Sequence, residues 1–293
     1  MAPPYTGVAG AGGRPARRAL RTRSRRCGEH LPTGRTRVNT LLTVSGLVKR
    51  FGGHHALDGA TFSVAEGSIT GLIGPNGAGK TTCFNCIAGS LSPDDGHVSF
   101  AGEEITGLPP DAVFRRGLTR TFQIPQELGA MSVLENLMLV PSAQSGENLW
   151  ESLLRPRRVA AQEHEIAERA RATLALVELD GQAELYAGNL SGGQRKLLEL
   201  ARALMSEPRM ILVDEPSAGV NPTLTLRLLE LIRSLRESRA ITFLVIAHDM
   251  DLIARLCETL VVMTNGRVLT EGDPRSVLED PLVQEAYLGS QHR

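Results

Sequence analysis

Apolar and polar residues tend to alternate from Leu41 to Leu47 and again from Thr61 to Val64. Alternation with a period of two is typical of strands that bury one face. Short clusters of turn-forming residues separate the runs, at positions 51–53, 58–59 and 66–67. The pattern predicts short antiparallel strands in this part of the chain.

The pattern changes at Ile69. The run from Ile69 to Ile73 leads into a glycine-rich loop, and Thr81 to Ala88 continues with helix-compatible residues until Gly89. Glycine at that point is a common end of a helix. This order predicts a strand, a loop and a helix.

Two later runs, 210–213 and 241–246, are continuously apolar and rich in β-branched residues. Such runs are typical of strands covered on both faces of a parallel sheet. Residues 261–263 and 267–270 flank Asn265-Gly266, a strong hairpin signal. The chain is therefore predicted to be an α/β protein with a terminal hairpin.

Between Leu134 and Asp180 the period becomes helical. Apolar residues recur every three or four positions, at Ile166, Ala170, Leu174 and Val177. Charged residues take the other side, at Glu163, Glu165, Glu168 and Arg171. This arrangement predicts an amphipathic helix in a helical insertion, with a loop over Val140 to Pro156.

The composition of the 293 residues, with 42% hydrophobic residues, is typical of a globular protein. No apolar run approaches the roughly 18 residues that span a bilayer, so any membrane role is expected to depend on a partner. The four cysteines show no framework-like spacing, which favours a reducing, cytosolic compartment.

The zero net charge conceals an asymmetry. Residues 1–38 contain nine arginines and one acid, Glu29, so the rest of the chain is mildly acidic. Because this segment is poor in large apolar residues, we expect it to be disordered. We favour a segment with no function, which an upstream translation start could generate, over an arm for nucleic acid or a membrane surface and over a targeting peptide.

The segment Gly74-Pro75-Asn76-Gly77-Ala78-Gly79-Lys80-Thr81 fits the P-loop pattern, and Thr82 follows it. In such a loop, backbone amides and a helix N-terminus surround phosphate groups. Lys80 is expected to neutralise the β and γ phosphates, and the Thr81 hydroxyl to hold Mg²⁺. An ordinary glycine turn between strand and helix would need neither side chain.

The apolar run 210–213 ends in two acids, Asp214 and Glu215. At the tip of a buried parallel strand, they are predicted to lie near the phosphates. Asp214 is expected to bind magnesium through water, and Glu215 to orient and deprotonate the attacking water. For the pair alone, a solvated acidic turn is an equally good interpretation.

The stretch from Asn189 to Leu204 begins with Ser191, Gly192, Gly193 and Gln194 and continues as a predicted helix that Ser191 caps. A glycine-flanked helix start is another anion site. Because one P-loop already holds a nucleotide, the second start suggests a nucleotide held by a second subunit. A simple helix cap would explain Ser-Gly-Gly alone.

The segment Leu190 to Gln194, placed between this P-loop and this Asp-Glu pair, closely resembles the ATP-binding subunits of ATP-binding-cassette transporters. The resemblance covers about residues 41–289. It implies a P-loop NTPase core with an antiparallel β subdomain and a helical subdomain. It also implies a head-to-tail dimer in which each ATP lies between the P-loop of one subunit and Ser191 to Gln194 of the other.

The resemblance assigns further residues by position. Gln123 matches the glutamine that reaches the metal and senses the membrane partner, and His248 matches the histidine that contacts the γ-phosphate. Phe51 matches the aromatic that stacks on adenine, with Ala56 beside it. Taken singly, Gln123 could be a surface residue, Phe51 a small core aromatic and His248 a helix cap.

Two segments, 120–139 and 280–289, resemble the ATP-binding subunits of branched-chain amino acid importers and related urea or amide importers. Asn221, where many members have aspartate, fits the same subfamily. Leu128 stands near the position of an aromatic that this subfamily usually has, which leaves the permease contact open. The resemblance implies uptake of branched-chain amino acids, with urea, short amides or other amino acids as alternatives.

The resulting prediction is an ATPase that binds ATP and Mg²⁺ and couples hydrolysis to import. It implies a second ATPase subunit, identical or homologous, two permeases, and a solute-binding protein outside the cell that acts through them. The expected location is the cytoplasmic face of the cell membrane, and no nucleic-acid partner is expected.

We expect an N-terminal extension over residues 1–40, an ATPase domain over 41–275 and a C-terminal tail over 276–293. The helical subdomain is expected at about 124–188. A non-transport cassette ATPase and a GTPase or kinase are alternatives. One cassette with a short insertion argues against the first, and the Ser191 segment without an Asn-Lys-x-Asp motif argues against the second.

Two motifs suggest other chemistry. Cys83 and Cys86 form a Cys-x-x-Cys pair, and His54-His55 could bind metal. No second pair or nearby histidine completes a zinc site around the cysteines. We therefore predict buried structural thiols and solvated histidines in a turn between strands.

Overall fold

The computed structural model describes residues 39–121, 127–142, 156–247 and 249–288. The predicted Arg-rich extension, apart from its last two residues, lies outside this range, as does most of the predicted 140–156 loop. Within the described part, no helix combines the length and apolar character needed to cross a bilayer.

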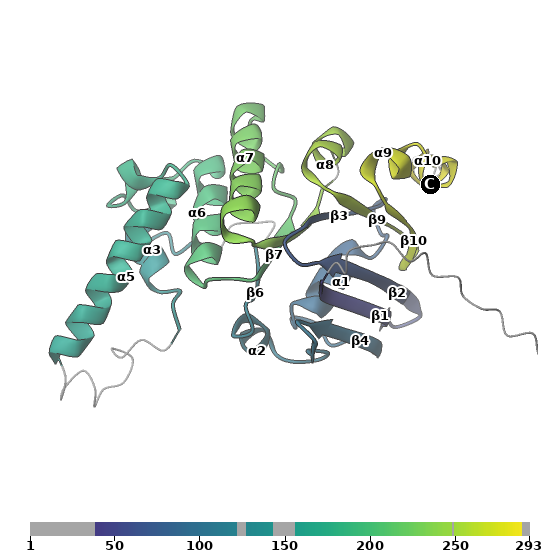
Figure 1. Cartoon of the computed structure of the whole chain (residues 1–293), viewed down its shortest axis with the longest axis horizontal. Helices are drawn as coiled ribbons and strands as arrows, with labels where there is room; N and C mark the ends of the chain where they lie inside the picture. The colour runs from purple at the N-terminus through teal and green to yellow at the C-terminus, as the bar shows by residue number, and fades with distance from the viewer. Residues whose placement is uncertain (1–38, 122–126, 143–155, 248, 289–293) are drawn as a thin grey trace, which may run out of the picture. The chain divides into compact units, whose positions relative to one another are not determined.

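A four-stranded antiparallel sheet forms one part of the fold, in the strand order β2-β1-β4-β5 (Figure 1). Its strands are β1 (Thr40–Phe51), β2 (His54–Ala65), β4 (Asp95–Phe100) and β5 (Glu103–Glu104). The predicted antiparallel pairing is confirmed, but the predicted turn at residues 58–59 is wrong. Strand β2 continues through it because Gly59, with a φ of 89°, is accommodated where the register with β1 shifts.

His54 and His55 therefore lie at the start of β2, and not in a loop as predicted. Both are exposed, and His55 Nδ1 lies 3.6 Å from Asp58 Oδ1. Asp58 is therefore a surface carboxylate partner for His55.

The second sheet has six strands in the order β10-β9-β3-β8-β7-β6. Strands β9, β3, β8, β7 and β6 run parallel, and β10 pairs antiparallel with β9. Their bounds are β3 (Ile69–Ile73), β6 (Leu118–Arg120), β7 (Met210–Asp214), β8 (Thr242–Ile246), β9 (Thr259–Thr264) and β10 (Arg267–Gly272). The predicted buried parallel strands and the terminal hairpin are confirmed.

Helices flank this sheet. Helix α1 (Lys80–Ile87) follows β3, so the predicted strand, loop and helix are confirmed, with Ala88 as C-cap and Gly89 just beyond it. Outside the insertion, the described residues also form the helices α2 (Pro110–Phe114), α6 (Gly192–Met205), α7 (Pro222–Arg239), α8 (Met250–Leu256), α9 (Pro274–Leu278) and α10 (Pro281–Leu288).

The predicted helical insertion contains α3 (Val133–Met138), α5 (Pro156–Leu176) and the 3₁₀ turns η2 (Asp180–Gln182) and η3 (Ala187–Asn189). Ile166, Ala170 and Leu174 of α5 are buried and Val177 just after it is also buried, whereas the four predicted charged positions are exposed. The helical period therefore identified the inward face of α5.

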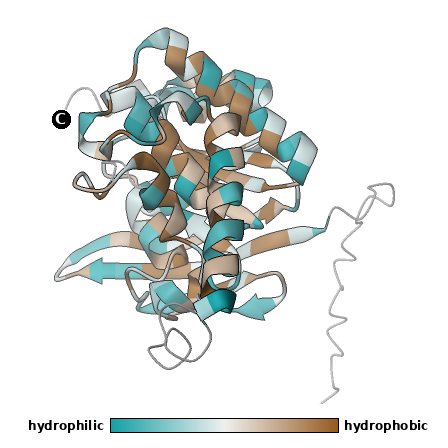
Figure 2. Cartoon of the chain, turned by 90° about the vertical axis from the view of Figure 1, so that its left-hand side faces the viewer, coloured by the Kyte–Doolittle hydropathy of each residue, from teal (hydrophilic) through white to brown (hydrophobic). Residues whose placement is uncertain are grey.

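The sheet divides the apolar core into two layers because neighbouring strand residues point to opposite faces. In β7, Ile211 and Val213 belong to the layer that packs against helices α3, α5, α6 and α7. Met210 and Leu212 belong to the other layer, which includes residues of α1 and of the antiparallel sheet. Figure 2 shows hydrophobic residues concentrated in the central strands and hydrophilic residues recurring along the outer helices.

Candidate functional site

The glycine-rich loop connects β3 to α1. Gly74, Gly77 and Gly79 all have positive φ angles, of 149°, 79° and 98°. A Cβ on Gly74 would lie 2.1 Å from Met263 O, and one on Gly79 would lie 2.4 Å from Ala56 O. A Cβ on Gly77 would meet nothing within 4 Å. Two of the glycines are therefore required by the protein's own backbone, and Gly77 faces open space.

Lys80 is the first residue of α1 and folds back over the loop. Its Nζ donates hydrogen bonds to Gly74 O at 2.7 Å and Pro75 O at 3.0 Å. The side chain is buried, and burial lowers the pKa of Lys80, an effect that the charges of Glu215 and Asp214 oppose. A cation held at the mouth of the loop is suited to bind phosphate oxygens.

A pocket of about 410 Å³ opens in front of this loop. It joins residues from β1, β2, α1 and the end of β7, and it is lined by Phe51, His54, Ala56, Asn76, Gly77, Ala78, Gly79, Lys80, Thr81, Thr82 and Glu215. The structure thus brings most of the predicted nucleotide contacts together. Phe51 is 52% exposed, so its ring is accessible to a flat base.

Glu215 directly follows β7 and adopts a φ of 50°, a left-handed conformation that is uncommon outside glycine. Its N–H donates to Ile246 O of the adjacent strand at 2.9 Å. Lys196 Nζ of α6 donates to Glu215 O at 3.4 Å. Neighbouring elements therefore hold the backbone in this conformation while the residue lines the pocket.

Asp214 is the last residue of β7 and is only 3% exposed. Its Oδ2 accepts a hydrogen bond from Arg120 NH2 at 2.9 Å. The same guanidinium donates to Asn85 Oδ1 of α1 and lies 5.9 Å from the centre of the Phe84 ring. The buried carboxylate is therefore charge-compensated and fixed relative to α1.

Arg120, Asn85 and Lys196 were not predicted as site residues. Arg120 lies in the quoted segment 120–139, but no local pattern connects it to Asp214. The contact follows from the pairing of β6 with β7, where Arg120 lies opposite Leu212. Knowledge of the strand order would have been needed to find it.

The residues that could hold magnesium are Thr81, whose side chain is exposed at the start of α1, and Asp214. Both offer oxygen atoms, which Mg²⁺ prefers, and Mg²⁺ typically takes only one or two protein ligands beside phosphates. Among the described residues no group of three or more His, Cys, Asp or Glu side chains could hold a metal ion, so an all-protein metal cage is not present there. The oxygen donors fit magnesium that is bound together with a phosphate.

Ser191 to Gln194 form the start of α6. Ser191 Oγ accepts from Gln194 N at 3.3 Å, and Gln194 Oε1 accepts from Ser191 N at 2.9 Å. The predicted cap is confirmed as a reciprocal capping box. Within the described part of the chain, these four residues do not line the pocket of Lys80.

Gly192 and Gly193 differ in their surroundings. A Cβ on Gly193 would lie 2.1 Å from Leu224 Cδ2 of α7, whereas one on Gly192 would come no closer than 3.9 Å to Gly219 O. The start of α6 therefore packs against α7 on one side and is exposed at Ser191 and Gly192.

Gln123 and His248 lie outside the described residues. The next residue, Asp249, is the N-cap of α8, and its side chain accepts a hydrogen bond from Leu252 N at 3.0 Å. Asn221 caps α7 by accepting from Leu224 N at 2.9 Å. The departure from aspartate at position 221 thus retains a good capping residue.

Cys83 and Cys86 lie inside α1 and are buried, as predicted. Burial raises the pKa of both thiols, that of Cys86 to about 11. Both are therefore protonated at neutral pH and behave as small apolar side chains.

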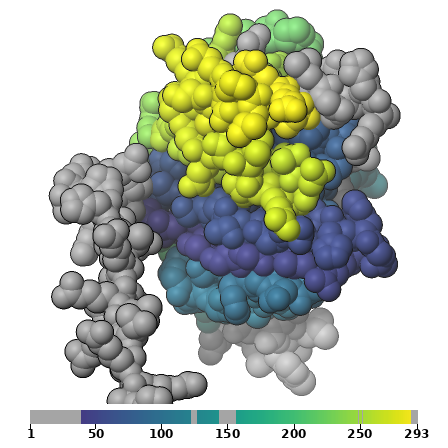
Figure 3. Space-filling model, turned by 90° about the vertical axis from the view of Figure 1, so that its right-hand side faces the viewer, coloured from purple at the N-terminus to yellow at the C-terminus, as the bar shows by residue number. Residues whose placement is uncertain are grey.

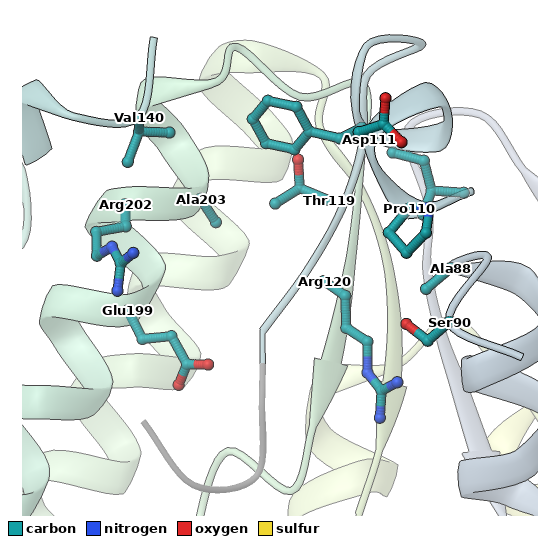
Figure 4. A pocket seen from close by; sticks show the side chains of 12 residues that line it. Ala88, Ser90, Pro110, Asp111, Thr119, Arg120, Val140, Glu199, Arg202 and Ala203 are labelled. Carbon is teal, nitrogen blue, oxygen red and sulfur yellow. The ribbon is translucent and has the colours of Figure 1, made fainter. Parts of the chain in front are cut away.

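A second pocket, of about 440 Å³, lies beside Arg120 (Figure 4). Glu199, Arg202 and Ala203 of α6 line one side, and Pro110, Asp111, Ala88 and Ser90 line the other. The pocket is open to solvent, and its walls come from strand β6, helices α2 and α6, and the residues that end and follow α1.

A protein-family model described as "ABC transporter" matches residues 57–218. A second model, "Branched-chain amino acid ATP-binding cassette transporter", matches residues 267–293. A probable branched-chain amino acid transport ATP-binding protein, LivG, from Archaeoglobus fulgidus is 43% identical over 251 residues. That alignment covers 86% of this chain and 96% of the relative.

Two solved structures are also similar. One is the ADP conformation of an ATP-binding cassette of an ABC transporter, with a TM-score of 0.73, 39% identity, and coverage of 85% of this chain and 99% of the other. The other is the dimeric structure of a post-hydrolysis state of an ATP-binding cassette bound to ADP and Pi. Its TM-score is 0.67 at 26% identity, with coverage of 80% of this chain and 99% of the other.

Proposed function

The chain belongs to the ATP-binding proteins of ABC transporters, in the branched-chain amino acid transport subfamily, and on that basis we propose that it drives uptake of branched-chain amino acids. It is an ABC transporter ATPase. The proposal for the solute rests on the subfamily match at both the main domain and the C-terminus. Urea, short amides and other amino acids are the alternative solutes.

The observation that carries the ATPase function is the pocket in which Lys80, Thr81, Glu215 and Phe51 meet. We propose that the triphosphate lies against Gly77 to Thr82, with the base on Phe51 and Ala56. Lys80 then exchanges its two carbonyl partners for phosphate oxygens. Glu215 orients the attacking water and accepts its proton, and Gln123 and His248 are proposed to complete the site.

Thr81, Asp214 and Gln123 are proposed to hold magnesium, which would supply neutralisation of phosphate charge. Asp214 is already ionically paired with Arg120, so the guanidinium keeps the carboxylate oriented near α1. We expect Arg120 to position Asp214 when nucleotide binds.

The exposed helix start at Ser191 and Gly192 is proposed to meet the nucleotide of a second ATPase subunit. Because Ser191 to Gln194 do not line this chain's own pocket in the described structure, a partner copy would complete the site. The similar cassette solved as a dimer supports this arrangement. ATP binding would then join two subunits, and loss of the γ-phosphate would separate them.

The pocket beside Arg120 is proposed as the permease contact (Figure 4). Its walls combine apolar surface with Glu199 and Arg202, a mixture suited to a short amphipathic helix. The position next to Arg120 would transmit permease movement to Asp214. The chain would then be peripheral to the cytoplasmic face of the membrane, with the solute-binding protein acting through the permeases.

We also propose the domain organisation given by the sequence: an extension over 1–40, an ATPase domain over 41–275 with a helical subdomain at about 124–188, and a tail over 276–293.

The function is tested by co-purifying the chain with its permeases in lipid nanodiscs and measuring phosphate release from ATP or GTP. Stimulation by the binding protein loaded with leucine, but not with urea, would support the proposed solute. Stimulation only by the binding protein loaded with urea would show that urea, and not a branched-chain amino acid, is the solute. A preference for GTP would contradict the ATPase assignment.

The permease contact has its own test. Ser90 is exposed at the rim of the pocket, so Ser90→Trp should fill it without disturbing the core. We expect less co-purification with permeases while the isolated chain hydrolyses ATP at the wild-type rate. Ser238→Trp, at an exposed site on α7, is the matched control. Unchanged permease binding in Ser90→Trp would exclude this pocket as the contact.

A further inference from the structure

The turn between β9 and β10 lies between the phosphate loop and strand β2. Gly266 N–H donates to Ala78 O at 3.1 Å, and Asp58 N–H donates to Gly266 O at 2.9 Å. A Cβ on Gly266 would lie 2.9 Å from both Ala56 O and Asp58 N. The turn therefore fits closely against both walls of the nucleotide pocket from outside it.

An ion pair fixes the same turn from the side. Arg267 Nε and NH2 donate to Asp58 Oδ2 at 2.9 and 2.7 Å. The hydrogen bond from Arg267 is the main reason that the pKa of Asp58 is lowered. Because both side chains are partly exposed, this ion pair contributes little to the free energy of unfolding. Its main effect is to fix the orientation of the turn relative to β2.

The C-terminal segment contacts the phosphate loop a second time, at its first glycine. Gly74 leaves no room for a Cβ beside Met263 O of β9. Tyr287 of α10 packs against the core, its hydroxyl is buried, and the Gly74 backbone is near enough to lower the pKa of that hydroxyl against the larger effect of burial. Burial raises the pKa of Tyr287 to about 12, so the hydroxyl is protonated at neutral pH.

Helix α10 is attached to the body of the protein by Val283, which is 2% exposed and belongs to the same core layer as β3 and β9. Leu282 on the same helix is 59% exposed, so α10 has one inward face. Figure 3 shows the C-terminal segment in yellow beside the purple strands of the antiparallel sheet, and β10 contacts β2.

Met263, Gly266 and Tyr287 do not line the nucleotide pocket in the described structure. They contact instead the loop backbone on either side of Gly77, at Gly74 and Ala78. Any effect on nucleotide must therefore pass through the shape of the loop. A loop held in its binding conformation loses less conformational entropy when phosphate arrives.

We propose that residues 265–287 form a C-terminal brace that positions the phosphate loop, and that Tyr287 is a positioning residue for ATP binding. This inference rests on the proposed function of the pocket. Docking of α10 and binding of ATP favour each other. By linkage, the coupling must act in both directions.

The test compares full-length wild type with Tyr287→Phe, which removes the hydroxyl and retains the ring. We expect ATP, with magnesium, to bind about fivefold more weakly, which corresponds to about 1 kcal/mol, because the buried hydroxyl no longer supports the loop backbone at Gly74. In steady-state kinetics KM for ATP should rise while kcat stays near the wild-type value. Tyr186→Phe, at a tyrosine that is 60% exposed, should bind like wild type.

A second measurement uses the reciprocal effect. Addition of ATP should slow amide hydrogen exchange over residues 281–287 in wild type, and the slowing should be smaller in Tyr287→Phe. A purely structural tyrosine would change exchange equally with and without ATP. Arg267→Gln, which removes the ion pair with Asp58, should weaken ATP binding in the same direction but less.

Wild-type affinity in Tyr287→Phe, or α10 exchange that does not respond to ATP, would overturn the brace while leaving the ATPase assignment intact. If wild type itself does not bind ATP, the proposed function fails and the brace fails with it.

Discussion

The two glycine-rich helix starts of this protein are built in opposite ways. Helix α1 begins after Gly79, whose left-handed backbone offers no side-chain cap. Helix α6 begins after Ser191, which forms a reciprocal capping box with Gln194. The N-terminal amides of α1 are thus left for a ligand, whereas α6 satisfies part of its own start.

The supports of the two starts also differ. Backbone carbonyls of other strands enclose Gly74 and Gly79, whereas Gly193 meets the end of a leucine side chain. The α1 loop is fixed from behind by its own chain, and the α6 start is self-capped and exposed. The comparison fits the proposal that one start holds a phosphate and that the other is presented to a nucleotide bound by a second subunit.

The largest expected effect is at Glu215, which contacts both regions: it lines the phosphate pocket, and its carbonyl accepts from Lys196 of α6. Glu215→Gln removes the proposed base, so ATP turnover should fall by roughly 10²- to 10⁴-fold. ATP-bound dimers should persist in size-exclusion chromatography. Glu230→Gln on α7 is the control, and turnover at the wild-type rate in Glu215→Gln would remove Glu215 from this role.

Lys80→Met tests only the helix start that is proposed to hold a phosphate, that of α1. Loss of a buried cation at the loop should lower turnover roughly 10²- to 10³-fold and, unlike Glu215→Gln, should also weaken ATP binding. Equilibrium binding of a fluorescent ATP analogue measures the difference. Arg239→Met, at an exposed position, should retain affinity, and retained affinity in Lys80→Met would contradict the proposed contact.

Ser191→Ala, compared with Ser132→Ala, separates the capping of α6 from the proposed contact of Ser191 with a nucleotide on a second subunit. Ser132 of α3 is a matched control because it forms an equivalent capping box with Glu135. Each substitution should cost about 1 kcal/mol in urea unfolding. Only Ser191→Ala should also reduce turnover, by about tenfold, the effect of one lost charge-assisted hydrogen bond. Equal turnover in both variants would show that Ser191 is a cap and nothing more.

The glycine supports are compared by Gly79→Ala and Gly77→Ala. Both positions have positive φ, but only Gly79 also faces a carbonyl at 2.4 Å. Gly77→Ala should cost about 1 kcal/mol from backbone strain, and Gly79→Ala clearly more. Thermal unfolding measures which variant loses more stability. Equal losses would argue against the view that the Ala56 carbonyl encloses Gly79.

The smallest effect distinguishes the two capping boxes by pH. The Glu135 carboxylate accepts a hydrogen bond from the Ser132 N–H, which lowers the pKa of Glu135. Gln194, at the same position of the other box, cannot titrate. Stability from Glu135 is therefore present above the ordinary glutamate pKa and is lost as pH falls through the lowered value. The difference in urea midpoint between wild type and Glu135→Gln should be present at pH 7 and shrink toward pH 3. A difference independent of pH would contradict this account.

Several elements could be predicted from local sequence because their signals are short-range. Continuous apolar runs identified β3, β7 and β8, the helical period identified the buried face of α5, and cap and glycine signals located both helix starts. The prediction at Gly59 was wrong because a glycine with positive φ marks either a turn or a bulge, and pairing with β1 decides which.

The sequence by itself determined where the P-loop, the Asp-Glu pair and the capped Ser-Gly-Gly start lie along the chain, because each is encoded within a few neighbouring residues. Only the tertiary structure decided that Arg120 meets Asp214, that Gly74 and Gly79 are required by Met263 and Ala56, and that Tyr287 reaches the phosphate loop. These contacts join residues 23 to 213 positions apart, so strand order and packing create them and no local pattern records them.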